Sequence, residues 1–268
     1  MNQELVSIIM PTYNSAKHVA KSIDSILNQT YKNWELVITD DCSTDNTISI
    51  LNNFSIKEKR IKVFKLKENK GAGYSRNYSI EKSQGKYIAF CDSDDCWMPQ
   101  KLEQQINLMH EKKCCLSFTS YFERDEEDNE TGIIIAPKQI TLSELKKDNK
   151  IGCLTAIYDT SMYGKFYMPT IRKRQDWALF LTILKKCNIA YAIQEPLAYY
   201  RLCKNSISTN KFSLIRYNIK VYKKVFGYSE IKANLYFYFV FMPNYLHKVI
   251  RNKFIYILYK TKLISKKQ

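Results

Sequence analysis

The stretch Lys86-Tyr87-Ile88-Ala89-Phe90-Cys91-Asp92-Ser93-Asp94-Asp95 joins a short apolar run to three closely spaced carboxylates. Residues 86–90 have the length and composition of a buried strand, and the carboxylates follow its end. Three such neighbours repel one another unless a cation or solvent screens them. Mn²⁺ and Mg²⁺ take oxygen ligands, commonly one or two carboxylates together with substrate phosphates. The alternative is a solvated acidic turn that caps the next helix, and the cluster alone does not separate the two interpretations.

The segments around this strand repeat an alternation of strand and helix. Short apolar runs predict strands, and apolar residues at helical spacing predict the helices between them. The expected strands are residues 5–10, 34–39, 61–66 and 86–90, and the expected helices are 15–28, 46–53, 72–83 and 99–111. This order predicts an α/β fold with a mostly parallel sheet flanked by helices. Later segments are less regular, with strands expected at 115–120, 133–136 and 153–158, an acidic exposed turn at 121–131, and helices at 175–187 and 212–226.

Polar residues follow three of the expected strands. Pro11-Thr12-Tyr13-Asn14 follows the first, Asp40-Asp41 the second, and Asp92 to Asp95 the fourth. Open α/β sheets bind ligands beyond the carboxyl ends of their strands. We therefore expect the three clusters to converge on one binding site.

Several candidate residues have a structural interpretation beside the functional one. The carboxylates of segment 40–45 suit hydrogen bonds to a base or ribose, or the capping of a helix. Tyr13 suits stacking on a base, or is an ordinary loop aromatic. The glycines of segment 71–77 suit a turn and close packing, because the GxGxxG and Walker patterns are absent, and Arg76 suits a diphosphate or an ion pair. Asp176 suits a general base, or a carboxylate favoured by the helix dipole.

The positive charge is concentrated at the end of the chain. The net charge is +16, yet residues 201–268 hold 15 Lys and Arg with Glu230 as their one acid, which leaves +2 on residues 1–200. This distribution predicts a basic amphipathic helical tail over residues 209–268 that docks on an anionic membrane surface. The alternative is a solvated basic tail. Because the first part is nearly neutral, nucleic acid is not expected as a partner.

Cysteine usage and the start of the chain bear on location. None of the eight Cys form CxxC pairs or zinc-like spacings, and several lie in apolar runs, as buried thiols do. The start Met-Asn-Gln-Glu lacks the basic and apolar regions of a signal peptide. No run of about 18 apolar residues occurs. We expect a cytoplasmic protein at the inner face of the membrane.

The order of motifs resembles the family 2 inverting glycosyltransferases of the GT-A fold, of the bacterial cell-surface polysaccharide type. The matching segments are 6–14, 40–45, 71–77, 90–97, 166–169, 174–177, 196–201 and 205–208. The resemblance covers about residues 5–208, so we assign residues 1–208 to the transferase domain. It implies transfer of a sugar from a nucleotide-sugar, most commonly a UDP-sugar, to a hydroxyl of a glycan or lipid-linked acceptor. Capsule, lipopolysaccharide or another surface glycan would be the product.

The resemblance also implies roles for residues. Asp176 occupies the slot of the catalytic base, and Asp94 and Asp95 are assigned to the Mn²⁺ or Mg²⁺ ion. The residues assigned to the donor are Pro11, Thr12, Tyr13, Asp41, Arg76, Asp92, Ser93 and Asp94. Many members carry Glu-Asp at the base, where this chain has Gln175-Asp176. Loss of the neighbouring carboxylate should leave the pKa of Asp176 less raised than a like-charge pair would make it.

Other classes fit the sequence less well. A dehydrogenase or a sugar nucleotidyltransferase should have a Gly-rich turn after the first strand, where this chain has Pro-Thr-Tyr-Asn. A basic nucleic-acid-binding protein should carry its charge on the folded part. A membrane adaptor without transferase activity remains possible from charge alone, and hydrolysis of a nucleotide-sugar by the pure protein would exclude it.

Overall fold

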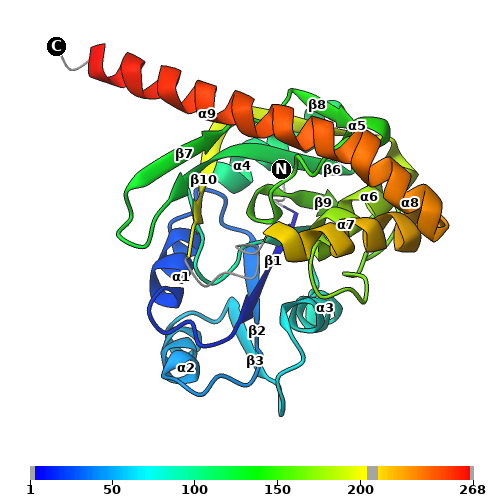
Figure 1. Cartoon of the computed structure of the whole chain (residues 1–268). Helices are drawn as coiled ribbons and strands as arrows, with labels where there is room; N and C mark the ends of the chain where they lie inside the picture. The colour runs from blue at the N-terminus through cyan, green and yellow to red at the C-terminus, as the bar shows by residue number, and fades with distance from the viewer. Residues whose placement is uncertain (1–3, 204–210, 266–268) are drawn as a thin grey trace.

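The computed structural model describes residues 4–203 and 211–265, and its centre is a ten-stranded mixed sheet (Figure 1). Eight strands follow the order β3-β2-β1-β4-β9-β6-β10-β5, while β7 pairs with β6 and β8 with β10. The parallel first part consists of β1 (Val6–Thr12), β2 (Trp34–Asp40), β3 (Ile61–Lys65) and β4 (Tyr87–Phe90). These strands lie where the apolar runs predict them, and the mixed α/β fold is confirmed.

Helices cover both faces of this part of the sheet. Alternate residues of β1 belong to different cores, since Ile9 packs with Ile80 whereas Ile8 and Met10 pack with Ile23. Figure 1 shows α1 and α2 on one side of the strands and α3 on the other. The helices are α1 (Val19–Leu27), α2 (Thr47–Lys57), α3 (Ala72–Lys82) and α4 (Lys101–Lys112).

The second part of the sheet has more strands than the sequence analysis predicted. It contains β5 (Cys96–Trp97), β6 (Leu116–Arg124), β7 (Glu130–Ile134), β8 (Gln139–Thr141), β9 (Ile157–Asp159) and β10 (Ile189–Arg201). The acidic turn expected at 121–131 is shorter, because β6 pairs with both β7 and β10 as far as Arg124. Similarly, 153–155 form a short 3₁₀ turn ahead of β9. Antiparallel β9 joins β4 to β6.

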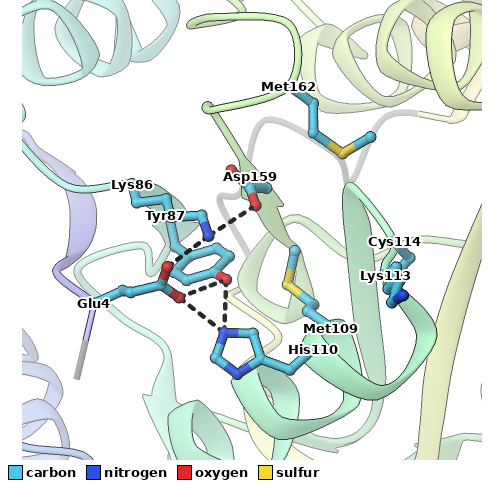
Figure 2. A pocket seen from close by; sticks show the side chains of 9 residues that line it. All are labelled: Glu4, Lys86, Tyr87, Met109, His110, Lys113, Cys114, Asp159 and Met162. Atoms are coloured by element: carbon cyan, nitrogen blue, oxygen red, sulfur yellow. Dashed lines mark hydrogen bonds and ion pairs between the residues drawn. The ribbon is translucent and has the colours of Figure 1, made fainter. Parts of the chain in front are cut away.

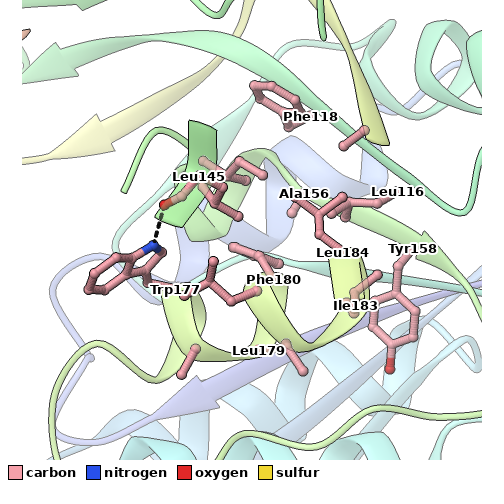
Figure 3. Close-up of a cluster of buried hydrophobic side chains, with 14 of the residues drawn as sticks. Leu116, Phe118, Leu145, Ala156, Tyr158, Trp177, Leu179, Phe180, Ile183 and Leu184 are labelled. Atoms are coloured by element: carbon pink, nitrogen blue, oxygen red, sulfur yellow. Dashed lines mark hydrogen bonds between the residues drawn. The ribbon is translucent and has the colours of Figure 1, made fainter. Parts of the chain in front are cut away.

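A large core surrounds α6 (Gln175–Cys187), the helix that begins beside the candidate base (Figure 3). The Trp177 indole is fully buried, and its Nε1 donates a hydrogen bond of 2.9 Å to the Leu145 carbonyl of α5 (Leu142–Lys147). Its ring centroid lies 5.5 Å from that of Tyr222 and 5.2 Å from that of Phe241. Contacts with α5 and with the aromatic rings of Tyr222 and Phe241 therefore fix the start of α6.

The C-terminal helices contribute to that core. They are α7 (Lys211–Phe226), α8 (Glu230–Tyr236), a π-helical turn (Phe237–Phe241) and α9 (Met242–Ser265). Phe237 and Phe241 are buried in the core beside Trp177. The expected boundary between residues 208 and 209, and the matching segment 205–208, lie outside the described residues.

The outer side of α9 is apolar where a solvated helix is usually polar. Leu246, Ile250, Phe254 and Ile257 are all at least half exposed. Their spacing of four, four and three residues places them on one face of the helix. In Figure 1 the far half of α9 extends beyond the strands. Among the described residues, no helix is long and apolar enough to cross a membrane.

Several cysteines are buried, as expected. Cys91, Cys96 and Cys114 are buried free thiols. Cys115 and Cys187, however, are joined by a disulfide between the start of β6 and the end of α6. The sequence analysis did not foresee this pairing.

Candidate functional site

One cavity of about 870 Å³ opens at the carboxyl ends of β1 and β4 and at the start of α6. It brings together residues that are far apart in the chain. Every residue that the sequence analysis assigned to the site lines it: Pro11, Thr12, Tyr13, Asp41, Arg76, Asp92, Ser93, Asp94, Asp95 and Asp176. Their common location is a finding, while their individual roles stay predictions.

The end of β2 is built from buried hydrogen bonds. The Asp40 carboxylate accepts bonds from the Thr12 hydroxyl (3.0 Å) and the Ser43 amide (2.9 Å), so it holds two strand ends together. The Asp41 carboxylate accepts bonds of 2.7 Å from the amides of Lys70 and Gly71. It thereby fixes the loop before α3, and a carboxylate with about four acceptor positions keeps capacity for a ligand.

Tyr13 and Ser93 differ in accessibility. The Tyr13 side chain is 50% exposed at the cavity, as a ring available for stacking must be. Ser93 is buried, and its hydroxyl shares a 2.8 Å hydrogen bond with the hydroxyl of Ser15. Its carbonyl accepts a bond of 2.9 Å from the Ser22 hydroxyl of α1. Ser93 thus fixes the loop of residues 92–95, the acidic loop, to α1.

Arg76 forms the ion pair that the sequence left as one of two possibilities. Its Nη2 lies 2.7 Å from both carboxylate oxygens of Asp92. Burial opposes the charge of the guanidinium, but the Asp92 carboxylate outweighs it and raises the pKa of Arg76, with a further contribution from Asp176. Arg76 therefore places a positive charge between the acidic loop and the candidate base.

Asp94 and Asp95 are held in a negative, poorly hydrated environment. Burial, reinforced by the neighbouring Asp92 charge, raises the pKa of Asp94 to about 6. Burial and the charges of Asp94 and Asp92 raise the pKa of Asp95 far above its usual range. The Asp95 carboxylate also accepts a hydrogen bond of 3.1 Å from the Arg201 amide.

The acidic loop fits a divalent cation through one or two of its carboxylates. Its donors are hard oxygens, and a nearby cation would relieve the repulsion among them. Asp92 is engaged with Arg76, which leaves Asp94 and Asp95 as the available ligands. Among residues 4–203 and 211–265, no three potential ligands form a ready-made metal site. Oxygens from a bound phosphate would therefore have to complete the coordination.

Asp176 lies in the first turn of α6, after an unusual backbone. Arg174 has φ of 66° in the left-handed region, which non-glycine residues adopt at a cost. Next to it, the Gln175 amide packs against α3, where a Cβ on Gly73 would lie 2.1 Å from Nε2. This close contact confirms the packing role expected for Gly73, while the φ of 87° at Gly71 fits the expected turn. The contact at Gly73 couples the position of the candidate base to α3.

Several cavity residues were not predicted from the sequence. Arg201 at the end of β10 donates through Nε to the Asp94 carbonyl (3.2 Å) and pairs through Nη2 with Asp128 (2.6 Å). It ties the acidic loop to the turn between β6 and β7. Further basic side chains line the cavity, and they include Lys150, Arg172, Arg174, Lys248 and Arg251. The basic excess of residues 201–268 was a signal for Lys248 and Arg251, whereas the nearly neutral first part gave none for Lys150, Arg172 and Arg174.

A second cavity, of about 660 Å³, lies at the opposite ends of the parallel strands (Figure 2). Glu4 pairs with Lys86 (2.6 Å) and also shares a hydrogen bond of 2.8 Å with the His110 ring. The hydrogen bond from Lys86 is the main cause that lowers the pKa of Glu4 to about 2. With these contacts satisfied, the first cavity is the better candidate for an active site.

Comparison with known sequences gives a consistent family. Residues 7–169 match the model of glycosyl transferase family 2. The chain is 42% identical over 230 residues to the putative teichuronic acid biosynthesis glycosyltransferase TuaG of Bacillus subtilis, covering 85% of this chain and 91% of that protein. It is 41% identical over 217 residues to the UDP-Glc:alpha-D-GlcNAc-diphosphoundecaprenol beta-1,3-glucosyltransferase WfgD of Escherichia coli, covering 81% and 84%.

Solved structures share the fold. S. aureus TarS 1-349 in complex with UDP-GlcNAc superposes with a TM-score of 0.66 at 19% identity, covering 87% of this chain and 70% of that one. The mannosyltransferase PcManGT of Pyrobaculum calidifontis, in complex with GDP-Man and Mn²⁺, gives 0.65 at 16% identity, covering 88% and 69%.

Proposed function

Because the chain belongs to glycosyl transferase family 2, we propose that it transfers a sugar from a UDP-sugar to a hydroxyl of a lipid-linked glycan. That it is a glycosyltransferase follows from the family. The donor and acceptor classes are our proposal, supported by the names of two relatives that act on a diphosphoundecaprenol-linked sugar. The observation that carries it is the single cavity that joins the three strand ends to Asp176.

Asp176 is the proposed general base. It removes the proton of the acceptor hydroxyl while that oxygen attacks the anomeric carbon of the donor. The bond from that carbon to the diphosphate breaks on the opposite face, so the nucleoside diphosphate leaves and the configuration inverts. Arg76, whose Nη2 lies 2.7 Å from both carboxylate oxygens of Asp92, supplies a fixed positive charge at the inner end of the cavity.

Asp94 and Asp95 would hold the divalent cation. When bound, the cation supplies positive charge that stabilises the diphosphate leaving group. The chain itself contributes the other contacts of the donor. Tyr13 stacks on the base, and Asp41 with Thr12 lines the base pocket at the ends of β2 and β1.

The test compares donor binding with turnover. We expect UDP-sugars to bind in a screen with Mn²⁺ and less well without it. Asp176→Asn should keep that binding and lose turnover by about 10²–10⁴-fold, as expected for a missing general base. Glu103→Gln is the matched control, because it removes an acid from the first turn of α4, away from the cavity. Near wild-type turnover of Asp176→Asn would show that another group is the base.

We also propose that the outer face of α9 docks on an anionic membrane, at the inner face of the cytoplasmic membrane. Its exposed apolar residues are accompanied by Lys253 and Lys260, a pattern typical of interfacial helices. Deleting the helices after residue 228 would also remove Phe237 and Phe241 from the core. Substitutions on the outer face are therefore the cleaner test.

The docking experiment uses sedimentation with vesicles. Phe254→Ser combined with Ile250→Ser should reduce binding to vesicles that contain anionic lipid by about tenfold or more, since each buried apolar side chain contributes. Ile56→Ser is the control, because Ile56 is 80% exposed on α2. Equal sedimentation of both variants and wild type would contradict docking through this face.

A further inference from the structure

The cavity carries a second charged region that the donor site does not use. Lys150 comes from the loop after α5, Arg172 and Arg174 from the segment before α6, and Lys248 and Arg251 from α9. We call these five residues the cationic side of the cavity. Three separate segments thus bring like charges together, which costs repulsion unless an anion is present.

The charges on this side are only partly neutralised within the protein. Lys248 is committed to buried Asp148, with Nζ to Oδ1 at 2.7 Å and a second bond of 2.7 Å to the Asn149 carbonyl. In the part of the chain that the structure describes, Lys150, Arg172 and Arg251 form no ion pair with a carboxylate. Asp148 neutralises Lys248, and Asp176 lies two residues from Arg174, but Lys150, Arg172 and Arg251 leave an excess of positive charge among these five residues.

A buried donor without a partner points in the same direction. The Nε of Arg174 is shielded from solvent and has no hydrogen-bond partner among the described residues. Arg174 lines the cavity. An unsatisfied buried N–H is costly, so its presence in a cavity wall favours a ligand that accepts hydrogen bonds. Since Asp176 is two residues from Arg174, such a ligand would lie next to the proposed base.

We propose that the cationic side binds a diphosphate group of the acceptor, the group that joins its sugar to a lipid. This proposal rests on the proposed function, because it assumes a lipid-linked acceptor. In the proposed function the donor diphosphate is served by the acidic loop with its cation, so a second anion is needed to account for the cations on this side. Arginine suits the task because its planar group binds phosphate oxygens in pairs.

The position of α9 agrees with such an acceptor. Its Lys248, Arg251 and Asn252 line the cavity, whereas Leu246 and Ile250 are exposed on the other side of the same helix. A diphosphate held by the inner side would therefore lie close to where its lipid enters the bilayer. The same helix would recognise both parts of one molecule.

The experiment measures binding of geranyl diphosphate to the full-length protein by calorimetry, with UDP saturating and Mn²⁺ in excess over both diphosphates. Saturation with UDP blocks the donor site. We expect Arg172→Gln and Arg251→Gln each to weaken geranyl diphosphate binding by about tenfold, the effect of losing a charge-assisted contact. Lys224→Gln is the control, because it removes an exposed charge from α7 outside the cavity. UDP affinity should be equal in all variants, which also verifies their folding.

The outcomes separate the two proposals. If UDP binds but geranyl diphosphate does not, or binds every variant equally, the acceptor site is overturned while the proposed donor function stands. If UDP does not bind, the donor proposal fails, and geranyl diphosphate titrated into the free protein still tests the cationic side. Inorganic pyrophosphate serves as a second probe. We expect it to bind more weakly than geranyl diphosphate, with the same sensitivity to Arg172→Gln, and tight binding insensitive to that change would contradict the site.

Discussion

Substitution of Lys101 would measure how much a buried ammonium group lowers the free energy of unfolding. It is the first residue of α4, it is fully buried, and its Nζ has no hydrogen-bond partner among the described residues. The Nζ lies 4.0 Å from the ring centroid of Trp97. Burial lowers the pKa of Lys101 to about 7, against an ordinary value of 10.5.

The sign and size of the effect follow from this difference in pKa. Between pH 7 and 10.5 the unfolded chain holds a proton that the folded chain has lost. Unfolding then takes up a proton, so the free energy of unfolding rises with pH across this window. A difference of about 3.5 units at 1.36 kcal/mol per unit corresponds to about 5 kcal/mol. Lys101→Met should remove most of this cost at pH 7, a gain of about 3–5 kcal/mol.

Urea unfolding at pH 7, 8 and 9.5 tests the prediction. The advantage of Lys101→Met should be largest at pH 7 and shrink toward pH 9.5, where the folded wild type and the variant are both uncharged at this site. Lys57→Met, at an exposed position of α2, should change the free energy of unfolding by less than about 0.5 kcal/mol at each pH. A variant less stable than wild type at pH 7, or with the same pH dependence, would refute the reasoning.

Two further changes probe the surroundings of Asp176. Gly73→Ala places a methyl group against Gln175 and should break its hydrogen bond to the Ile171 carbonyl, lowering kcat by about tenfold, a loss that 1 Å shifts near a reacting group can cause. Adding Gln175→Ala should restore part of the loss by making room, and an unchanged kcat in the single variant would contradict the coupling. Trp177→Ala should lower the free energy of unfolding by about 3–5 kcal/mol, since the side chain is fully buried. Chemical denaturation measures it, with Trp177→Phe expected to lose less; equal losses would speak against the cavity as the cause.

The parallel part of the fold could be predicted because periodicity and sheet topology act locally. Residues 175–187 have helical spacing and form α6 at the same bounds. By contrast, β10 was missed because Pro196 lies inside it, and proline is unfavourable in a strand. The structure accommodates Pro196 at shifts in the register with β6.

The site divides in the same way. The strand-end positions of Asp41 and Asp92 follow from the order of strands, so the sequence was sufficient to bring them together. Arg201 bonds Asp95 across 106 positions of sequence, and no local pattern encodes that contact. From the sequence, Arg76 suited either a diphosphate or an ion pair, and the structure shows the ion pair with Asp92. Long-range electrostatics decides such cases.

The two sides of α9 would set the distance between the bilayer and the cavity. An α-helix with its side chains is about 10–12 Å thick. With Leu246 and Ile250 in the lipid, the cavity wall formed by Arg251 and Asn252 lies about one helix thickness above the hydrocarbon. Only a hydroxyl on the sugar next to the lipid would then reach Asp176, and hydroxyls farther out on a longer glycan would not. A glycan that has grown by one sugar would then no longer be an acceptor. The thickness of α9 would therefore help to set the order in which sugars are added.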